Sequence, residues 1–281
     1  MSKTRAKWSN NTPQSETVIR QKEKSPLAKI SVVSCVNDFE KYNSCVRSSF
    51  REEQEEGTVE LIPVDNTANG LSAPQALNQG LKKAGGRIVV FCHQDVTFPD
   101  EWTGKLLEQI SIIENTHKNW GVLGTFGVAK SGMLAGHILD HGVRFHCPPL
   151  PAEVQSLDEH CLIMKSDSGL SFDEDIGGFH LYGADICIQA MAKGLINFAI
   201  DACLEHLSPG DKLGADFYEA MNRLYQKWRN RNAPLAIIET TCKLCRLQGG
   251  LAGRIAYEIG RHKRKRRRKK MRKLQKHQQG L

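Results

Sequence analysis

An apolar run that ends in polar residues is the part of this sequence with the clearest capacity for chemistry. Residues 88–92 are apolar or small, and His93, Gln94 and Asp95 follow them directly. Such a run is typical of a strand buried on both faces of a parallel sheet. Ligands of open α/β sheets bind beyond the carboxyl ends of the strands, where a carboxylate can hold a divalent cation together with phosphate oxygens. The alternative is that Asp95 only caps the turn before Pro99.

The elements around this strand predict an α/β fold. Three strand–helix units follow one another, with strands at 30–35, 59–65 and 87–92 and helices at 40–51, 73–84 and 101–114. This succession predicts a parallel sheet with right-handed crossovers, flanked by helices. The second strand, like the third, ends in an acid, which is Asp65.

The second half of the chain has shorter and more irregular elements. We predict strands at 120–126, 153–157, 161–165 and 197–201, a hairpin region at 132–145, and helices at 184–193, 211–230, 234–248 and from 252 onward. Cys242 and Cys245 fall in the third of these helices. A lone Cys-x-x-Cys pair is a poor zinc signal, so we interpret them as thiols packed on one helix face.

Composition and charge divide the chain into a globular part and two polar ends. The net charge is +8, but residues 261–276 carry 12 Lys or Arg and no acid, which leaves 27 basic against 31 acidic residues elsewhere. Residues 1–28 are polar and aperiodic, which predicts a disordered extension. The basic segment predicts a solvated tail that binds polyanions, either an anionic membrane surface or nucleic acid. Nine cysteines spread through apparent strands and helices favour a reducing compartment and a cytoplasmic location.

The order of these features resembles a GT-A glycosyltransferase of the bacterial family-2-like branch. The matching motifs are the strand at 30–33, Val64-Asp65-Asn66, Ala76-Leu77-Asn78-Gln79-Gly80, His93-Gln94-Asp95 at the Asp-x-Asp position, the segment 178–185, and His206. Two positions depart from the pattern. His93 replaces the first Asp of Asp-x-Asp, as in a subset resembling capsule-type enzymes, and Ala184-Asp185 replaces the usual Glu-Asp pair.

This resemblance implies a Rossmann-like GT-A fold with a mostly parallel central sheet and a C-terminal helical extension. It also implies metal-dependent, inverting sugar transfer in which Asp95 and His206 converge on a shared Mn²⁺ or Mg²⁺. The cation would neutralise the departing diphosphate of a nucleotide sugar. Asp65, Asn78 and His93 would contact the donor.

On the acceptor side, the resemblance implies that Asp185 is the general base. Glu174 and Asp175 are the alternatives for that role. Three further side chains are expected near the acceptor: Asp158, His180 and Tyr182. His180 and Tyr182 would stack on a sugar ring or line the edge of the core.

The resemblance implies a glycan or lipid-linked acceptor in surface polysaccharide synthesis. A lipid-linked acceptor favours the membrane over nucleic acid as the partner of residues 261–276, and hence a peripheral position on the inner face of the cell membrane. The expected division is an extension at 1–28, a GT-A domain at 29–231, a helical segment at 232–260 and a polybasic tail at 261–281. A catalytically silent module that binds sugar nucleotides, a nucleotidyltransferase and a nucleic-acid-binding protein are the alternatives.

Overall fold

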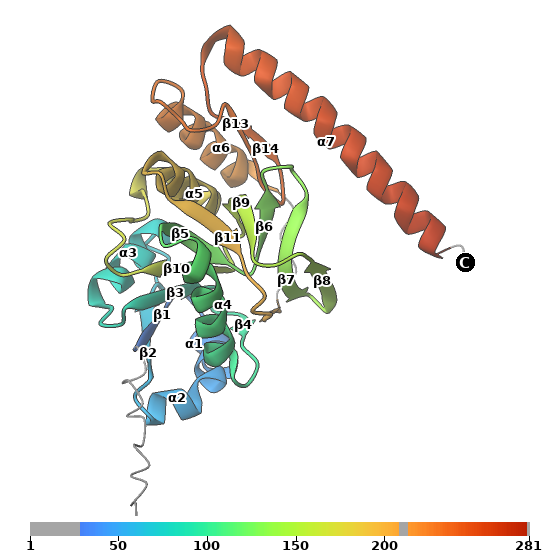
Figure 1. Ribbon diagram of the computed structural model, residues 1–281. Coiled ribbons are helices and arrows are strands. Elements are labelled where there is room, and N and C mark those ends of the chain that lie inside the picture. The colour runs from blue at the N-terminus through green and yellow to red at the C-terminus, as the bar shows by residue number, and fades with distance from the viewer. Residues whose placement is uncertain (1–28, 208–212, 280–281) are drawn as a thin grey trace, which may run out of the picture.

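The structure is a computed structural model that describes residues 29–207 and 213–279, with side chains up to residue 270. Within these residues, twelve strands form one curled sheet with helices on both faces (Figure 1). The strand order is β2-β1-β3-β10-β5-β11-β9-β6-β7-β12-β4, and β8 pairs with β7. The predicted extension at 1–28 lies outside the described residues.

The N-terminal strands form the parallel part of the sheet. β1 (Ile30–Val36) pairs in parallel with β2 (Val59–Asp65) on one side and with β3 (Ile88–Cys92) on the other. Their carboxyl ends therefore meet at one edge of the sheet, as the sequence predicts. The helix α3 (Ala73–Lys83) connects β2 to β3, and the side chains of Ser72 and Gln75 cap its N-terminus reciprocally.

Beyond β3 the sheet is mixed. Antiparallel β10 (Cys161–Lys165) lies between β3 and β5 (Trp120–Gly124), and only β5–β11 and β7–β12 add parallel pairs among the described strands. The remaining strands are β4 (Val96–Thr97), β6 (Phe126–Ala129), β7 (Leu134–Asp140), β8 (Val143–Cys147), β9 (Ala152–Leu157), β11 (Ile196–Ala199) and β12 (Glu205–His206). The α/β class and the flanking helices are confirmed, but parallel pairing does not dominate the whole sheet.

Alternating residues of β3 reach two separate layers of core. Ile88 and Val90 pack with α4 (Trp102–Thr116), whereas Val89 and Phe91 pack with α3 and α5 (Tyr182–Ala192). This is the physical basis of the continuous apolar run, since both faces of the strand are covered. The predicted helical character of 40–51 is confirmed, but the segment is not one regular helix: it consists of α1 (Phe39–Tyr42), the π-helical η1 (Asn43–Arg47) and, after a break at Phe50, α2 (Arg51–Glu55).

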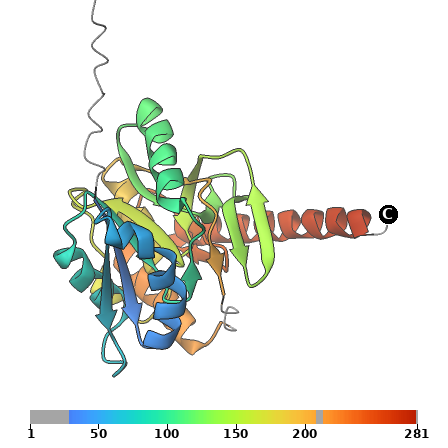
Figure 2. The ribbon, with the colours of Figure 1, turned by 90° about the horizontal axis from the view of Figure 1, so that it is seen from below.

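The C-terminal part packs a third core cluster on the outer side of α5. The elements around this cluster are the short 3-10 helix η2 (Glu174–Ile176), α6 (Ala215–Trp228) and a hairpin. The long helix α7 (Gly250–Gln279) follows the hairpin and extends well beyond the body of the protein (Figures 1 and 2). None of the described helices is long and apolar enough to cross a membrane.

The predicted helix at 234–248 is wrong. This segment forms the hairpin of β13 (Ile237–Glu239) and β14 (Leu244–Arg246), whose strands pair in an antiparallel way. The β-branched residues at 237, 238, 240 and 241 favour extended backbone over helix. Cys242 is consequently exposed in the turn whereas Cys245 is buried, so the two thiols do not share a helix face.

Candidate active site

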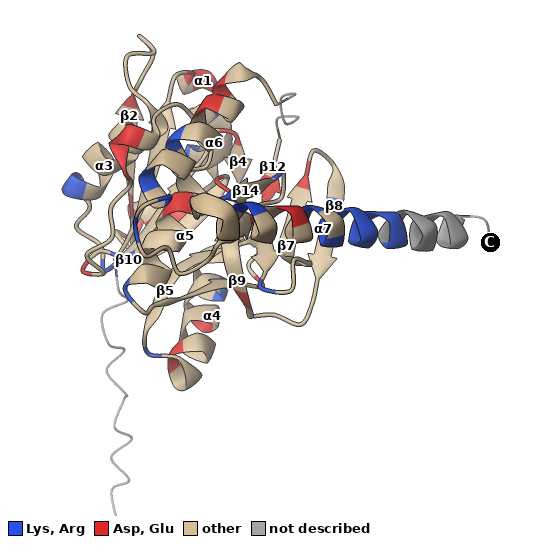
Figure 3. Cartoon of the chain, turned by 90° about the horizontal axis from the view of Figure 1, so that it is seen from above, with Lys and Arg blue, Asp and Glu red and all other residues tan. Residues whose placement is uncertain are grey.

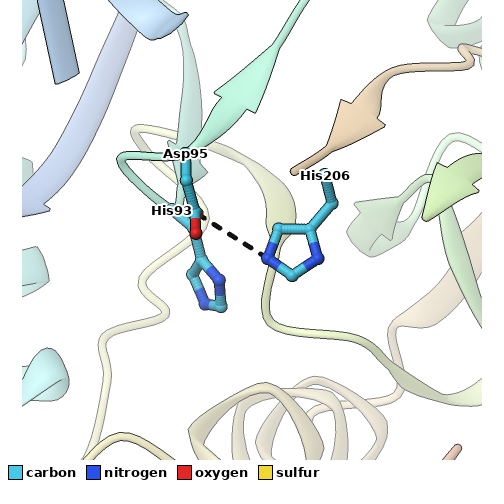
Figure 4. Close-up of side chains that lie close together, drawn as sticks. All are labelled: His93, Asp95 and His206. Carbon is cyan, nitrogen blue, oxygen red and sulfur yellow. Dashed lines mark ion pairs between the residues drawn. The ribbon is translucent and has the colours of Figure 1, made fainter. Parts of the chain in front are cut away.

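Asp95 and His206 lie close together although they come from distant parts of the sequence. Asp95 lies between β3 and β4, and β4 pairs with β12, which places His206 opposite Val96. The Nε2 of His206 lies 3.6 Å from the Oδ1 of Asp95 (Figure 4). His93 completes the group, since one potential ligand atom from each of the three residues lies within 4.8 Å of the others. Two imidazoles and a carboxylate are suitable ligands for Mn²⁺.

Asp140 determines which nitrogen of His206 faces this group. In the parallel pair of β7 and β12, His206 lies beside Asp140, and its Nδ1 is 2.9 Å from the Asp140 Oδ1. An ionised carboxylate only accepts hydrogen bonds, so Nδ1 of His206 donates to Asp140 and Nε2 is the nitrogen that faces Asp95. A carboxylate behind a ligating histidine is typical of metal sites. Sequence reasoning missed Asp140, because only strand pairing reveals it.

His93 is held in its neutral form beside the group. Burial, together with the neighbouring His206, lowers the pKa of His93 to about 4. Its Nε2 lies 3.2 Å from the hydroxyl of Tyr182. Tyr182 is only 3% exposed and its ring packs edge-on against Phe172, so it lines the core and is not available to stack on a sugar. Of the two alternatives that the sequence leaves for Tyr182, this burial favours the one in which it lines the edge of the core.

Gln94 joins two loops at the same edge of the sheet. Its Oε1 accepts hydrogen bonds from the backbone N–H groups of Asn37 and Asp38, each at 3.0 Å, and its Nε2 donates to Asn37 Oδ1 at 2.5 Å. Gln94 therefore fixes the loop after β1 against the loop after β3. Its two neighbours, His93 and Asp95, form a cluster with His206.

Asp158 belongs to a series of hydrogen-bonded side chains next to the cluster. The Asp158 Oδ1 lies 3.2 Å from His160 Nδ1, and His160 Nε2 lies 2.6 Å from the hydroxyl of Thr125. Burial alone would raise the pKa of Asp158, but hydrogen bonds from His160 and Thr241 hold it well below its ordinary value. The ring centroid of His160 is 6.1 Å from that of His206, so this series of side chains adjoins the candidate metal site. Sequence reasoning missed His160.

Glu159, also missed, is a carboxyl group of different character. Burial and the adjacent Asp158 raise the pKa of Glu159 to about 8. Its Oε1 accepts a hydrogen bond from the N–H of Gly183 at 3.2 Å, at the start of α5. A Cβ on Gly183 would lie 3.0 Å from the Glu159 Cγ, so the Glu159 side chain fills the space next to this glycine.

Asp185 lies on the other side of α5, in contact with α6. Its side chain is 1% exposed, and its oxygens accept hydrogen bonds from Lys227 Nζ (2.7 Å), Gln189 Nε2 (2.7 Å) and Trp228 Nε1 (2.8 Å). Lys227 also pairs with Asp173. The contacts with Lys227 and Trp228 tie α5 to α6. Both oxygens of the predicted base are thus already engaged.

The remaining predicted residues lie apart from the cluster. Asp65 is exposed at the end of β2, and hydrogen bonds from Thr67 lower its pKa. Asn78 is 8% exposed and bonds the backbone of Phe172, which ties α3 to the loop before η2. Asn78 lines a cavity of about 590 Å³ whose walls include none of the cluster residues. His180 is partly exposed and pairs with Asp216 at 3.1 Å.

Comparison with known proteins gives the class of this chain. Residues 31–201, which are more than half of the chain, match the family described as "Glycosyltransferase like family". The chain therefore belongs to this glycosyltransferase-like family. A protein of Fuscovulum blasticum named "ATP synthase subunits region ORF 6" is 31% identical over 221 residues, which are 76% of this chain and 88% of that protein.

A solved mannosyltransferase structure shows the same GT-A fold. The mannosyltransferase PcManGT from Pyrobaculum calidifontis, in complex with GDP-Man and Mn²⁺, has a TM-score of 0.50 and 14% identity over 74% of this chain and 66% of its own. GalNAc-T7 with UDP, GalNAc and Mn²⁺ has a TM-score of 0.49 and 11% identity over 74% of this chain and 49% of its own. This chain thus spans about half to two thirds of these proteins.

Proposed function

We propose that the protein transfers a sugar from a nucleotide-sugar donor with the help of Mn²⁺ or Mg²⁺ held by Asp95 and His206. The observation that carries this proposal is the 3.6 Å approach of His206 Nε2 to Asp95 Oδ1, at the carboxyl edge of the parallel strands. Membership of the glycosyltransferase-like family supports the reaction class. The mannosyltransferase of similar fold was solved with GDP-Man and Mn²⁺, which supports the donor class and the metal.

The cation would stabilise the negative charge that grows on the departing diphosphate. His93 contributes no positive charge of its own, because its lowered pKa keeps it neutral, and it faces the donor phosphates as a polar neighbour. Asp65 is exposed at the same edge and is available to accept from the nucleoside. The contacts of Asn78 are structural and give no support to a donor role.

For the base we propose Glu159 in preference to Asp185. An acceptor hydroxyl could reach Asp185 only by displacing three donors from a side chain that is 1% exposed. Glu159 is partly exposed and next to Asp158, and burial brings its pKa into the range that suits proton removal near neutral pH. In an inverting reaction this carboxylate would take the acceptor proton while the sugar–phosphate bond breaks.

The acceptor is proposed to be a glycan or a lipid-linked sugar of surface polysaccharide, at the cytoplasmic face of the cell membrane. The nine cysteines are free thiols, which fits a reducing compartment. Asp158 and His180 are the polar side chains proposed for acceptor contacts. His180 lies on the α6 side, where its imidazole faces Asp216.

A catalytically silent module that binds sugar nucleotides is the second candidate. It is favoured by the single carboxylate in the candidate metal cluster and by the engagement of Asp185. Thermal-shift measurements with UDP-, GDP- and dTDP-sugars, with and without Mn²⁺, identify the donor in either case. Donor hydrolysis then separates the two. An enzyme hydrolyses its donor slowly with Mn²⁺ and loses this activity in Asp95→Ala, whereas a silent module binds the donor and leaves it intact.

A further inference from the structure

The first half of α7 is docked on the protein through small residues and two arginines. Gly253 and Gly260 are buried, and a Cβ at Gly260 would lie 2.5 Å from Ile237 Cδ1 of the hairpin. Arg264 pairs with Glu239 at 3.3 Å and donates to the carbonyl of Cys242 at 2.8 Å, and Arg267 also pairs with Glu239. The start of the basic segment is therefore packed, which corrects the prediction that all of 261–276 is solvated.

This docking leaves an apolar stripe on the opposite face of the helix. Leu251, Ile255 and Ile259 are 73%, 52% and 51% exposed, and their i, i+4, i+8 spacing places them in one row. On the docked side, Gly253 lies between Leu251 and Ile255 in the sequence, and Gly260 directly follows Ile259. We call these three side chains the apolar stripe. Contiguous exposed apolar side chains at helical spacing mark an interaction site.

Cations follow the apolar stripe along the same helix. Seven Lys or Arg between residues 261 and 270 are exposed, and α7 is blue along this part in Figure 3. Glu258 is the one acid among residues 250–270, and it pairs with Arg261 at 2.8 Å. The outer face of α7 thus begins apolar and continues strongly positive, on a helix whose orientation is fixed by the hairpin.

We infer that the outer face of α7 binds an anionic membrane surface, with the apolar stripe inserted at the boundary between headgroups and acyl chains. Exposed Lys and Arg beside buried Leu and Ile are characteristic of helices that lie in this interface. Nucleic acid would engage the cations but give no apolar surface to Leu251, Ile255 and Ile259. A second copy of α7 would bring two cationic segments together. An anionic membrane surface offers acyl chains to the apolar stripe and negative headgroups to the exposed Lys and Arg side chains.

The experiment is co-sedimentation of the full chain with vesicles, without donor or metal, so that its outcome is independent of the proposed reaction. Vesicles of phosphatidylcholine alone are compared with vesicles containing phosphatidylglycerol, and binding of duplex DNA is measured in parallel. The test variant replaces Leu251, Ile255 and Ile259 by Ser. The control variant replaces Ile112, Met133 and Val143 by Ser, which are exposed apolar residues of other elements.

We expect the wild type and the control to bind the anionic vesicles, and the test variant to bind them at least about ten-fold more weakly because apolar insertion is lost. DNA binding should be equal in all three proteins. Unchanged circular dichroism and melting temperature show that the exposed substitutions leave the fold intact. Equal vesicle binding by the test variant and the wild type, binding of neutral vesicles as strong as that of anionic ones, or no vesicle binding by the wild type would each overturn the inference.

Discussion

The Nδ1 of His206 donates to Asp140 at 2.9 Å, and this hydrogen bond directs the other imidazole nitrogen to Asp95. We predict that Asp140→Asn weakens Mn²⁺ binding by roughly 10- to 100-fold, since the ring loses its carboxylate partner. Isothermal titration with Mn²⁺ measures the change. Asp216→Asn is the matched control, because Asp216 pairs with His180 at 3.1 Å and neither residue belongs to a candidate metal group. Equal losses in both variants would argue against His206 as a ligand.

Asp185 is expected to contribute mainly to stability. Asp185→Ala leaves Lys227 buried without this partner and Trp228 Nε1 without its acceptor, so we expect a loss of about 3–5 kcal/mol in the free energy of unfolding. Denaturant titration measures it. Asp216→Ala, which removes an exposed pair with His180, should cost less than about 1 kcal/mol. A stable Asp185→Ala protein without activity would instead restore Asp185 as the base.

Glu159 should give the protein a characteristic dependence on pH. Its pKa is about 8 in the folded protein, against an ordinary Glu pKa of 4.5, so the unfolded chain releases this proton first as the pH rises. The stabilisation from this group is therefore complete below pH 4.5 and is lost between there and about pH 8. We expect Glu159→Gln to leave the melting temperature unchanged near pH 5 and to raise it relative to the wild type above pH 8.

The activity of the same variant tests the proposed base. Glu159→Gln keeps an oxygen that can accept from Gly183 but cannot remove a proton, so kcat should fall by ~10²-fold or more with little change in KM for the donor. Glu55→Gln, an exposed position on α2, is the control. Full activity in Glu159→Gln would show that this carboxylate only supports the start of α5.

Gly260 should accept a side chain only if the side chains of the hairpin shift. Gly260→Ala places a Cβ 2.5 Å from the Cδ1 end of the Ile237 side chain, and we expect a loss of about 1 kcal/mol through overpacking between α7 and the hairpin. Gly104→Ala, in α4, meets no atom within 4 Å and should stabilise by up to about 1 kcal/mol. Thermal unfolding of both variants checks the contrast. Equal effects would mean that α7 is not docked as described.

The sequence predicted those parts of the protein that local pattern determines. The apolar run at 88–92 required two covered faces, and Ser72 with Pro74 marked the start of α3. The segment at 237–246 was misread because its apolar residues recur at spacings that suit a helix, whereas its β-branched residues and tertiary contacts select a hairpin.

The sequence predicts the candidate site only in part, because some of its residues are brought together by tertiary structure alone. Asp95 and His206 each follow a recognisable strand, so their type and position pointed to the same edge. Asp140, Glu159 and His160 acquire their roles through strand register and burial, which no single-sequence pattern encodes. Asp185 had the expected position in its motif, but the contacts of its carboxylate depend on where α6 packs.

The side chains proposed to bind the cation lie on or next to β4 and β12, which are two residues long and joined by two paired positions. Strands this short contribute few backbone hydrogen bonds, and their pairing closes a long loop, so this edge should assemble late in folding. A cation bound between them would hold these two short strands together at the part of the sheet that forms last. Metal binding would therefore stabilise the structure of the site in addition to supplying its chemistry.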